Sequence, residues 1–286
     1  MKQFRMSSAF NLHSCSRENV SQYIRTGLEF YKEAGFDAID FGTTILSIDS
    51  DEWRAQAEQA LKDCEEVGIR FEMGHLPFVG GGAKSEEFLQ AFNAKMHNAI
   101  DAAAYLGLEY AVMHPNRPGI PAKKYDEKAE FETVMSQLAP YVEHANRVGL
   151  KVVVENMRTP VSPMQVRRYC QNADELCFLA DSLGIGICWD FGHANISGLK
   201  QSEALEKVGK RLKVIHVNDN GGIEDDHILP FTGNVDWKDA MHGLALAGYE
   251  GLFNFELAAT RAPAGMRKAY AAYVLEAGRE LTSYIV

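Results

Sequence analysis

The chain lacks paired cysteines, long apolar runs and a signal-peptide pattern. It has five cysteines, an odd number, and no Cys-x-x-Cys pair, which argues against a disulfide framework and a thiolate zinc site. No run approaches the roughly 20 apolar residues that a membrane span needs, and the N-terminal residues lack the apolar stretch of a signal peptide. We therefore expect a cytoplasmic protein with no membrane partner.

Positive charge is also scarce. The 29 Lys and Arg residues are outnumbered by 39 Asp and Glu, which gives a net charge of −10. A field of this sign does not favour the phosphate backbone of a nucleic acid, so we expect no nucleic-acid partner. The basic residues expected in the loops that follow strands are too few for a basic patch: Arg117, Lys123, Lys124, Arg158, Arg167 and Arg168.

The remaining composition is that of a globular protein. Of the 286 residues, 46% are hydrophobic and 24% charged, which excludes a disordered chain and supplies a sizeable core. The length lies within the range that α/β barrels fill as one domain.

One unit recurs along the chain: a helical segment, a glycine, a short apolar run, and then a polar or ionisable residue. Gly35 and Gly248 stand 213 residues apart over six steps, so eight steps of this length would use the whole chain. Each glycine is expected to end a helix in the left-handed conformation. The seven are Gly35, Gly68, Gly107, Gly149, Gly184, Gly209 and Gly248.

The apolar runs predict a parallel sheet covered by helices on both faces. An opening strand within residues 4–10 makes eight strands with the runs at residues 37–41, 69–73, 110–113, 151–154, 186–189, 212–215 and 252–255. Eight βα units close most simply into a (β/α)8 TIM barrel, which we expect as a single α/β domain over residues 1–286. An open doubly wound sheet is the alternative, but its glycine-rich dinucleotide turn is absent.

Ionisable side chains stand at the C-terminal ends of these runs. In a barrel these ends face one mouth, where active sites are built. One such residue alone is more often a cap or a loop partner, but here several strands supply one. They are His75, His114, Glu155, Asp190, His193, His216 and Glu256, with Asp225 and His227 in the loop after His216.

This residue set predicts a metal site. Imidazole and carboxylate groups bind divalent cations such as Zn, Mn, Fe, Co or Mg at neutral pH. The four-residue core of the predicted site comes from four consecutive strands: Glu155, Asp190, His216 and Glu256.

Several segments resemble the xylose-isomerase-like barrels of the sugar phosphate isomerase/epimerase type. The resemblance runs from the first strand to the last. It is carried by Met-Gly-His-Leu-Pro-Phe at 73–78, Met-His-Pro at 113–115, Glu-Asn at 155–156, Trp-Asp-Phe-Gly-His-Ala at 189–194, His-Val-Asn-Asp at 216–219 and Asn-Phe-Glu at 254–256.

The resemblance implies a small-molecule sugar or sugar phosphate as substrate and one divalent ion (Mn, Zn, Co or Mg). In the ketose 3-epimerases of this superfamily a Glu, Asp, His, Glu set binds the metal, and it maps onto Glu155, Asp190, His216 and Glu256. The arginine-bearing loop of those enzymes is replaced here by Asn-Asp-Asn-Gly-Gly at 218–222. Barrels of this kind often pair through their outer helices, so a homodimer is an open expectation.

Endonuclease IV, a phosphodiesterase with three zinc ions, belongs to the same superfamily. Its nine-ligand pattern also fits this chain, so three Zn ions remain the alternative metal content. The nine positions are His75, His114, Glu155, Asp190, His193, His216, Asp225, His227 and Glu256.

We therefore predict an enzyme that removes a proton from the carbon next to a sugar carbonyl. Glu155 and Glu256 would act as catalytic bases on opposite faces of that carbon, and the substrate would be bound by His75, His114, His193 and His227. Loss of a neighbouring hydroxyl after the same step would make the enzyme a dehydratase or lyase on a sugar or inosose. A barrel that binds a sugar or metal without turnover stays open.

Two weaker signals lie near the predicted mouth. The glycine-rich segment at 79–85 does not match a phosphate-binding loop and predicts a flexible lid. The rings of Phe78, Trp189 and Trp237 would either stack on a sugar or pack in the core.

Overall fold

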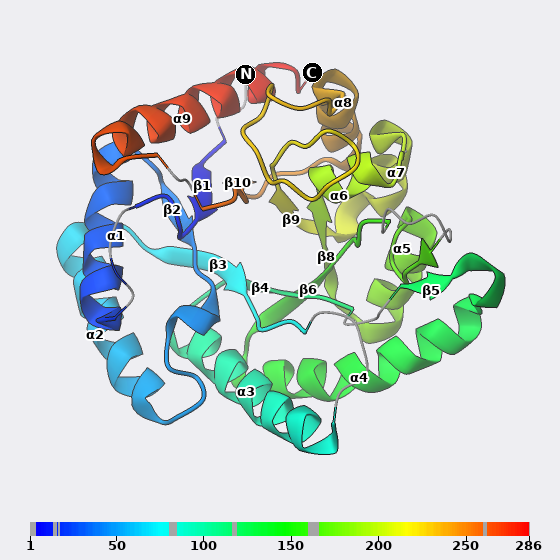
Figure 1. The fold of residues 1–286 in the computed structure, drawn as a ribbon, viewed down its shortest axis with the longest axis horizontal. Helices are drawn as coiled ribbons and strands as arrows, with labels where there is room; N and C mark the ends of the chain where they lie inside the picture. The colour runs from blue at the N-terminus through cyan, green and yellow to red at the C-terminus, as the bar shows by residue number, and fades with distance from the viewer. Residues whose placement is uncertain are drawn as a thin grey trace.

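The computed structural model describes residues 4–13, 16, 18–79, 85–115, 119–159, 166–259 and 262–285. Eight parallel strands form a nearly closed ring with helices around it (Figure 1), which confirms the predicted (β/α)8 TIM barrel. The strands are β1 (Met6–Ala9), β2 (Ala38–Asp40), β3 (Phe71–His75), β4 (Tyr110–Met113), β6 (Lys151–Glu155), β8 (Gly186–Asp190), β9 (Leu212–His216) and β10 (Phe253–Phe255).

The ring is closed by the last strand. β10 pairs in parallel with β1, where Met6 lies opposite Phe253. On its other side β10 meets the continuation of β9, where Val217 forms a single bridge with Phe255. The backbone N–H of Val217 donates to the carbonyl of Asn254 at 2.8 Å. The two ends of the chain therefore lie on the same side of the ring (Figure 1).

The helices alternate with the strands as the repeat predicts. Between β8 and β9 the crossover is split into two short helices. The helices are α1 (Val20–Ala34), α2 (Glu52–Val67), α3 (Glu86–Tyr105), α4 (Glu127–Val148), α5 (Ala173–Leu183), α6 (Phe191–Ile196), α7 (Gln201–Val208), α8 (Trp237–Ala247) and α9 (Arg267–Ser283). Short 3-10 turns span Thr43–Ile45, Ala122–Lys124, Gly209–Arg211 and Ala264–Met266.

The predicted helix-ending glycines behave as expected with one exception. Gly248 caps α8 in the left-handed region, with φ 65° and ψ 38°. Gly209 has φ 53° but ψ −135°, so the prediction of a left-handed cap is wrong there. The reason is that Gly209 opens a 3-10 turn that runs directly into β9.

A small antiparallel ribbon outside the barrel was not predicted. It pairs β5 (Ile120–Pro121) with β7 (Val166–Arg167), and so ties the loop after β4 to the loop after β6. Each strand has two residues, too few for an alternating pattern. Arg117, one of the basic residues expected in these loops, lies outside the described residues.

The barrel interior divides into an apolar lower part and a polar upper part. A separate buried cluster fills the lower part with one residue from each of five strands: Met73, Val112, Val153, Cys188 and Val214. Successive residues of a strand point to opposite faces, so the residue two positions later returns to the interior. Those positions are His75, His114, Glu155, Asp190 and His216.

Candidate active site

The four residues predicted to bind a metal converge on one point at the C-terminal mouth. One ligand atom from each of Glu155, Asp190, His216 and Glu256 lies within 4.8 Å of the other three. The Nδ1 atom of His216 is 3.2 Å from a carboxylate oxygen of Glu155 and 3.2 Å from one of Glu256. Glu155, Asp190 and His216 are buried, whereas 20% of the Glu256 side chain is exposed.

Polar atoms without a hydrogen bond indicate that this cluster fits a cation. The Oε2 atom of Glu155 and both ring nitrogens of His216 are buried without a hydrogen bond. Buried polar groups are nearly always hydrogen-bonded, and leaving them unpaired costs free energy. A divalent cation bound by the oxygen and nitrogen ligands would satisfy these atoms, because this donor set suits Mn, Zn, Co or Mg.

Asp190 is held rigidly by its neighbours. As the N-cap of α6 it accepts the backbone N–H of His193 on Oδ1 at 2.6 Å. Its other oxygen accepts a bond from Asn218 Nδ2 at 2.6 Å. The side-chain amide of Asn156 bonds to both the N–H and the carbonyl of Asp190. These contacts fix the carboxylate in one orientation, as partners of metal ligands commonly do.

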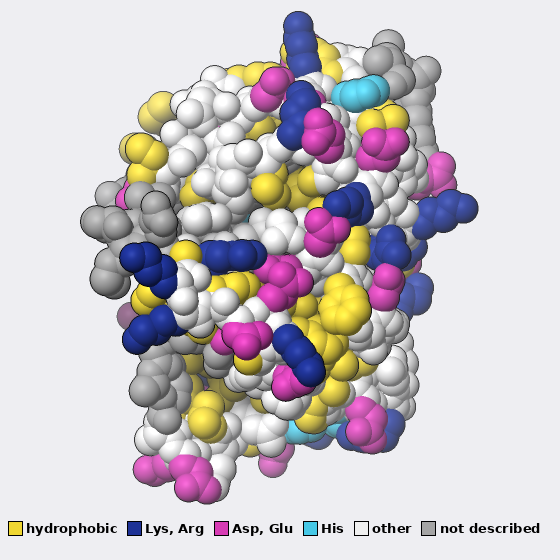
Figure 2. All heavy atoms as spheres, turned by 90° about the vertical axis from the view of Figure 1, so that its right-hand side faces the viewer, with side chains coloured by type: hydrophobic (Ala, Val, Ile, Leu, Met, Phe, Trp, Pro, Cys, Tyr) yellow, Lys and Arg dark blue, Asp and Glu magenta, His cyan; other side chains and the backbone are white. Residues whose placement is uncertain are grey.

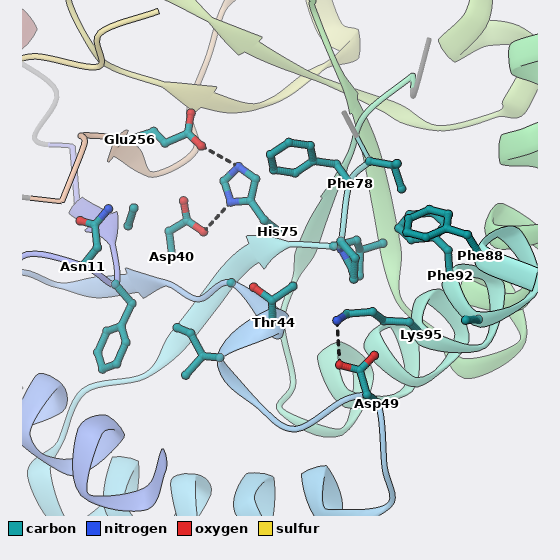
Figure 3. A pocket seen from close by; sticks show the side chains of 18 residues that line it. Asn11, Asp40, Thr44, Asp49, His75, Phe78, Phe88, Phe92, Lys95 and Glu256 are labelled. Carbon is teal, nitrogen blue, oxygen red and sulfur yellow. Dashed lines mark hydrogen bonds and ion pairs between the residues drawn. The ribbon is translucent and has the colours of Figure 1, made fainter. Parts of the chain in front are cut away.

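His75 lies on one side of the cluster, between two carboxylates (Figure 3). Its Nδ1 is 3.3 Å from Asp40 Oδ1 and its Nε2 is 3.0 Å from Glu256 Oε1. Asp40 ends β2 and accepts a bond from Asn254 Nδ2 at 3.0 Å. Asp40 is absent from the site predicted from the sequence, although it is a carboxylate at the end of a strand like the others.

His114 contacts the same cluster from β4. Its Nε2 is 3.2 Å from Glu155 Oε2, and the Phe78 ring lies 4.9 Å from its own ring, centroid to centroid. Together with His75 and Glu155, it forms a second group whose ligand atoms would also hold an ion.

A third group lies on the other side of the cluster, around Asp225. Asp225 is 3.4 Å from His193 Nε2 and 3.2 Å from His227 Nε2. The Nδ1 atoms of the two histidines face backbone carbonyls, of Asn156 at 2.8 Å and of Glu256 at 2.9 Å. A further candidate ligand group here is Asp190, His193 and His227.

The carboxylates and the imidazoles of the cluster stabilise one another's charged forms. Burial disfavours the charged form of Glu155, but His216 and His114 outweigh it and hold the pKa of this carboxyl well below its usual range. The same opposition lowers the pKa of Glu256, through His216 and His75. Burial disfavours the cation of His216, yet Cys188, Glu256 and Glu155 raise its pKa well above the usual value. The carboxylates therefore stabilise positive charge at this point.

Two cavities open onto the cluster. One of about 290 Å³ is lined by Phe78, Arg158 and Arg168 together with the histidines and both glutamates. The other, of about 690 Å³, shares His75 and Glu256 and extends between the loops that follow β2 and β3 and helix α3 (Figure 3).

The side chains of Trp189 and Trp237 are buried and bond to Gln201 and Asp219, so they pack in the core. The predicted lid falls mostly on residues 80–84, outside the described residues.

Comparison with known proteins identifies the family. The model of the xylose isomerase-like TIM barrel family matches residues 28–277, and the chain belongs to this family.

Relatives with an assigned activity are epimerases and isomerases. A putative hydroxypyruvate isomerase of Streptomyces coelicolor is 27% identical over 241 residues, which cover 78% of this chain and 81% of the relative. A fructoselysine 3-epimerase of Escherichia coli O157:H7 is 25% identical over 122 residues, 42% of this chain and 43% of the relative.

Among solved structures, a D-tagatose 3-epimerase-like protein superposes with a TM-score of 0.72 at 21% identity, covering 98% of both chains. This likeness shows a shared fold.

Proposed function

We propose that this protein is a divalent-metal-dependent isomerase or epimerase that removes a proton from the carbon next to the carbonyl of a sugar or sugar phosphate. The convergence of Glu155, Asp190, His216 and Glu256 on one point within 4.8 Å carries the proposal. The activities of the relatives support the same class of reaction.

The four residues would hold the ion, which when bound supplies a Lewis acid for the substrate carbonyl. Glu155 and Glu256 come from β6 and from the end of β10, and both line the smaller cavity. Their lowered pKa values keep both carboxylates ionised. One ionised carboxylate takes the proton from the substrate carbon. The other takes up a proton from water and delivers it to the opposite face, which inverts the carbon, and the first carboxyl then releases its proton to water. Returning the proton to the neighbouring carbon gives isomerisation.

Proton exchange tests the proposal without knowledge of the product. Protein loaded with Mn²⁺ in heavy water, given a panel of ketoses, inososes and hydroxypyruvate, should exchange the proton next to the carbonyl of at least one. Glu155→Gln and Glu256→Gln should slow the exchange by at least about 100-fold. Glu206→Gln, an exposed change on α7, is the matched control and should leave it unchanged. Full activity in either active-site variant would contradict the roles given to these residues.

A second candidate, a three-zinc phosphodiesterase, is favoured by the two flanking groups. Elemental analysis separates the candidates: one metal ion per chain supports sugar chemistry, whereas three zinc ions with hydrolysis of bis(p-nitrophenyl) phosphate would overturn it. A dehydratase would remove the proton and then the neighbouring hydroxyl of the substrate as water, so its product would be lighter than the substrate by one water.

A further inference from the structure

Two arginines that the proposed reaction does not use line the smaller cavity beside Glu155 and Glu256. Arg158 and Arg168 both belong to the loop that follows β6. A cavity of about 290 Å³ is small enough that a ligand at the glutamates would also reach its arginine wall.

The position of Arg168 follows from the ribbon that precedes it. Its neighbour Arg167 ends β7 and has partners within the protein. The Nη2 atom of Arg167 donates to Glu175 Oε1 at 2.8 Å, and its guanidinium lies over the Tyr125 ring, 4.2 Å from the centroid. Side chains of an extended segment alternate in direction. Arg168 accordingly points to the other side, where it lines the cavity.

Arg168 makes no hydrogen bond or ion pair within the described part of the chain, and its Nε atom is buried without an acceptor. Asp225 attracts its charge from further away, but that carboxylate is bonded to Arg158. Burial and the nearby guanidinium of Arg158 both lower the pKa of Arg168. Arg158 is already engaged, because its Nε donates to Asp225 at 3.1 Å. A partly buried guanidinium without an acceptor costs free energy that a bound anion would recover.

Lys95, a cation in the neighbouring cavity, already has an anionic partner. Lys95 of α3 lines the larger cavity, but its Nζ donates to Asp49 at 2.8 Å (Figure 3). Arg168 in the smaller cavity therefore differs from Lys95, because it has no hydrogen-bond acceptor in the described part of the chain.

We propose that Arg168, assisted by Arg158, binds an anionic oxygen group of the substrate, a carboxylate or a phosphate, while the reacting carbonyl lies at Glu155 and Glu256. The guanidinium offers a planar set of N–H donors that matches either group. The orientation of the substrate rests on the proposed function, whereas anion binding at Arg168 does not.

Three probes that share a three-carbon skeleton test the site: neutral dihydroxyacetone, its phosphate ester, and hydroxypyruvate with its carboxylate. Binding is measured by calorimetry on both metal-free and Mn²⁺-loaded protein. The wild-type protein should bind at least one anionic probe about 10- to 100-fold more tightly than dihydroxyacetone, and the tighter one identifies the group. Arg168→Gln should reduce the preference to within about twofold in both states, and Arg168→Lys should restore part of it.

Lys95→Gln is the matched control, since it removes a cation from the neighbouring cavity. It should leave the preference intact. Equal binding of neutral and anionic probes, a preference that survives Arg168→Gln, or its loss in Lys95→Gln would each overturn the proposal. Thermal unfolding of each variant confirms that it is folded.

Heavy-water exchange on the same samples separates this proposal from the proposed function. Anion binding through Arg168 without exchange of any probe or ketose leaves the anion site standing and the proposed reaction wrong. The opposite result is exchange with the same KM for neutral and anionic substrates, and with no change of KM in Arg168→Gln. This result would support the proposed reaction and contradict the anion site.

Discussion

At the scale of single residues, the protein holds Asp190, His193 and His227 by contacts behind the site. Backbone carbonyls accept from the Nδ1 atoms of His193 and His227, which leaves each Nε2 directed at Asp225. Contacts of this kind fix the tautomer and ring orientation. The predicted role of both histidines in substrate binding stays a prediction. A substrate bound there would have to displace Asp225 from their Nε2 atoms, because each Nδ1 atom already faces a backbone carbonyl.

The contact from Asn218 to Asp190 provides a prediction at this scale. Asn218→Ala removes the 2.6 Å bond to Oδ2 and frees the carboxylate to rotate. We expect the affinity for Mn²⁺ to fall by about 10- to 100-fold, measured by calorimetry.

Asn195→Ala is the comparison variant, since Asn195 bonds to Asn220 and Asn234 and not to a candidate ligand. Unchanged Mn²⁺ affinity in Asn218→Ala would show that this bond does not position Asp190.

At the scale of elements, the strand period explains how the site is assembled. Val153 fills the lower barrel and Glu155 reaches the mouth, and the same two-residue step separates Cys188 from Asp190. β3 adds a constraint of its own at Gly74, where an added Cβ would lie 2.0 Å from the carbonyl oxygen of Phe41. The glycine lets β3 lie close to the chain that follows β2.

Two glycine substitutions separate steric contact from backbone strain. Gly74→Ala should cost at least about 3 kcal/mol of unfolding free energy, because backbone has to move. Gly248→Ala meets nothing within 4 Å but keeps φ at 65°, so it should cost about 1 kcal/mol. Urea unfolding monitored by circular dichroism measures both, and equal costs would contradict the steric explanation.

At the scale of the whole molecule, closure of the ring places residues about 180 positions apart around one cavity. On the face in Figure 2, Lys and Arg are interspersed with Asp and Glu. The absence of a nucleic-acid partner stays a prediction. Lys207 forms an ion pair with Asp174 at 2.7 Å, and Arg211 forms one with Asp181 at 2.6 Å. No helix in the described ranges is long and apolar enough to cross a membrane. A cytoplasmic location and a homodimer stay predictions.

Metal removal provides the prediction at this scale. An ion held by residues of four strands binds the folded barrel and not the unfolded chain, so it should raise stability by about 2.7 kcal/mol at 100 times its dissociation constant. The melting temperature should therefore rise with Mn²⁺ and fall with EDTA. Asp190→Asn should lose most of this increment and Glu206→Gln should keep it. The same melting temperature with and without saturating Mn²⁺ would contradict binding at this cluster.

The repeat, the eight strands and the residue types at the strand ends can all be predicted from the sequence, because strand period and helix-ending glycines are local properties of the chain. The sequence could not reveal that Asp40 joins His75, or that Arg167 bonds to Glu175 while Arg168 has no hydrogen-bond acceptor among the described residues. Those outcomes depend on contacts between segments far apart in the chain. They were decided only when the barrel closed and the loops after β4 and β6 paired.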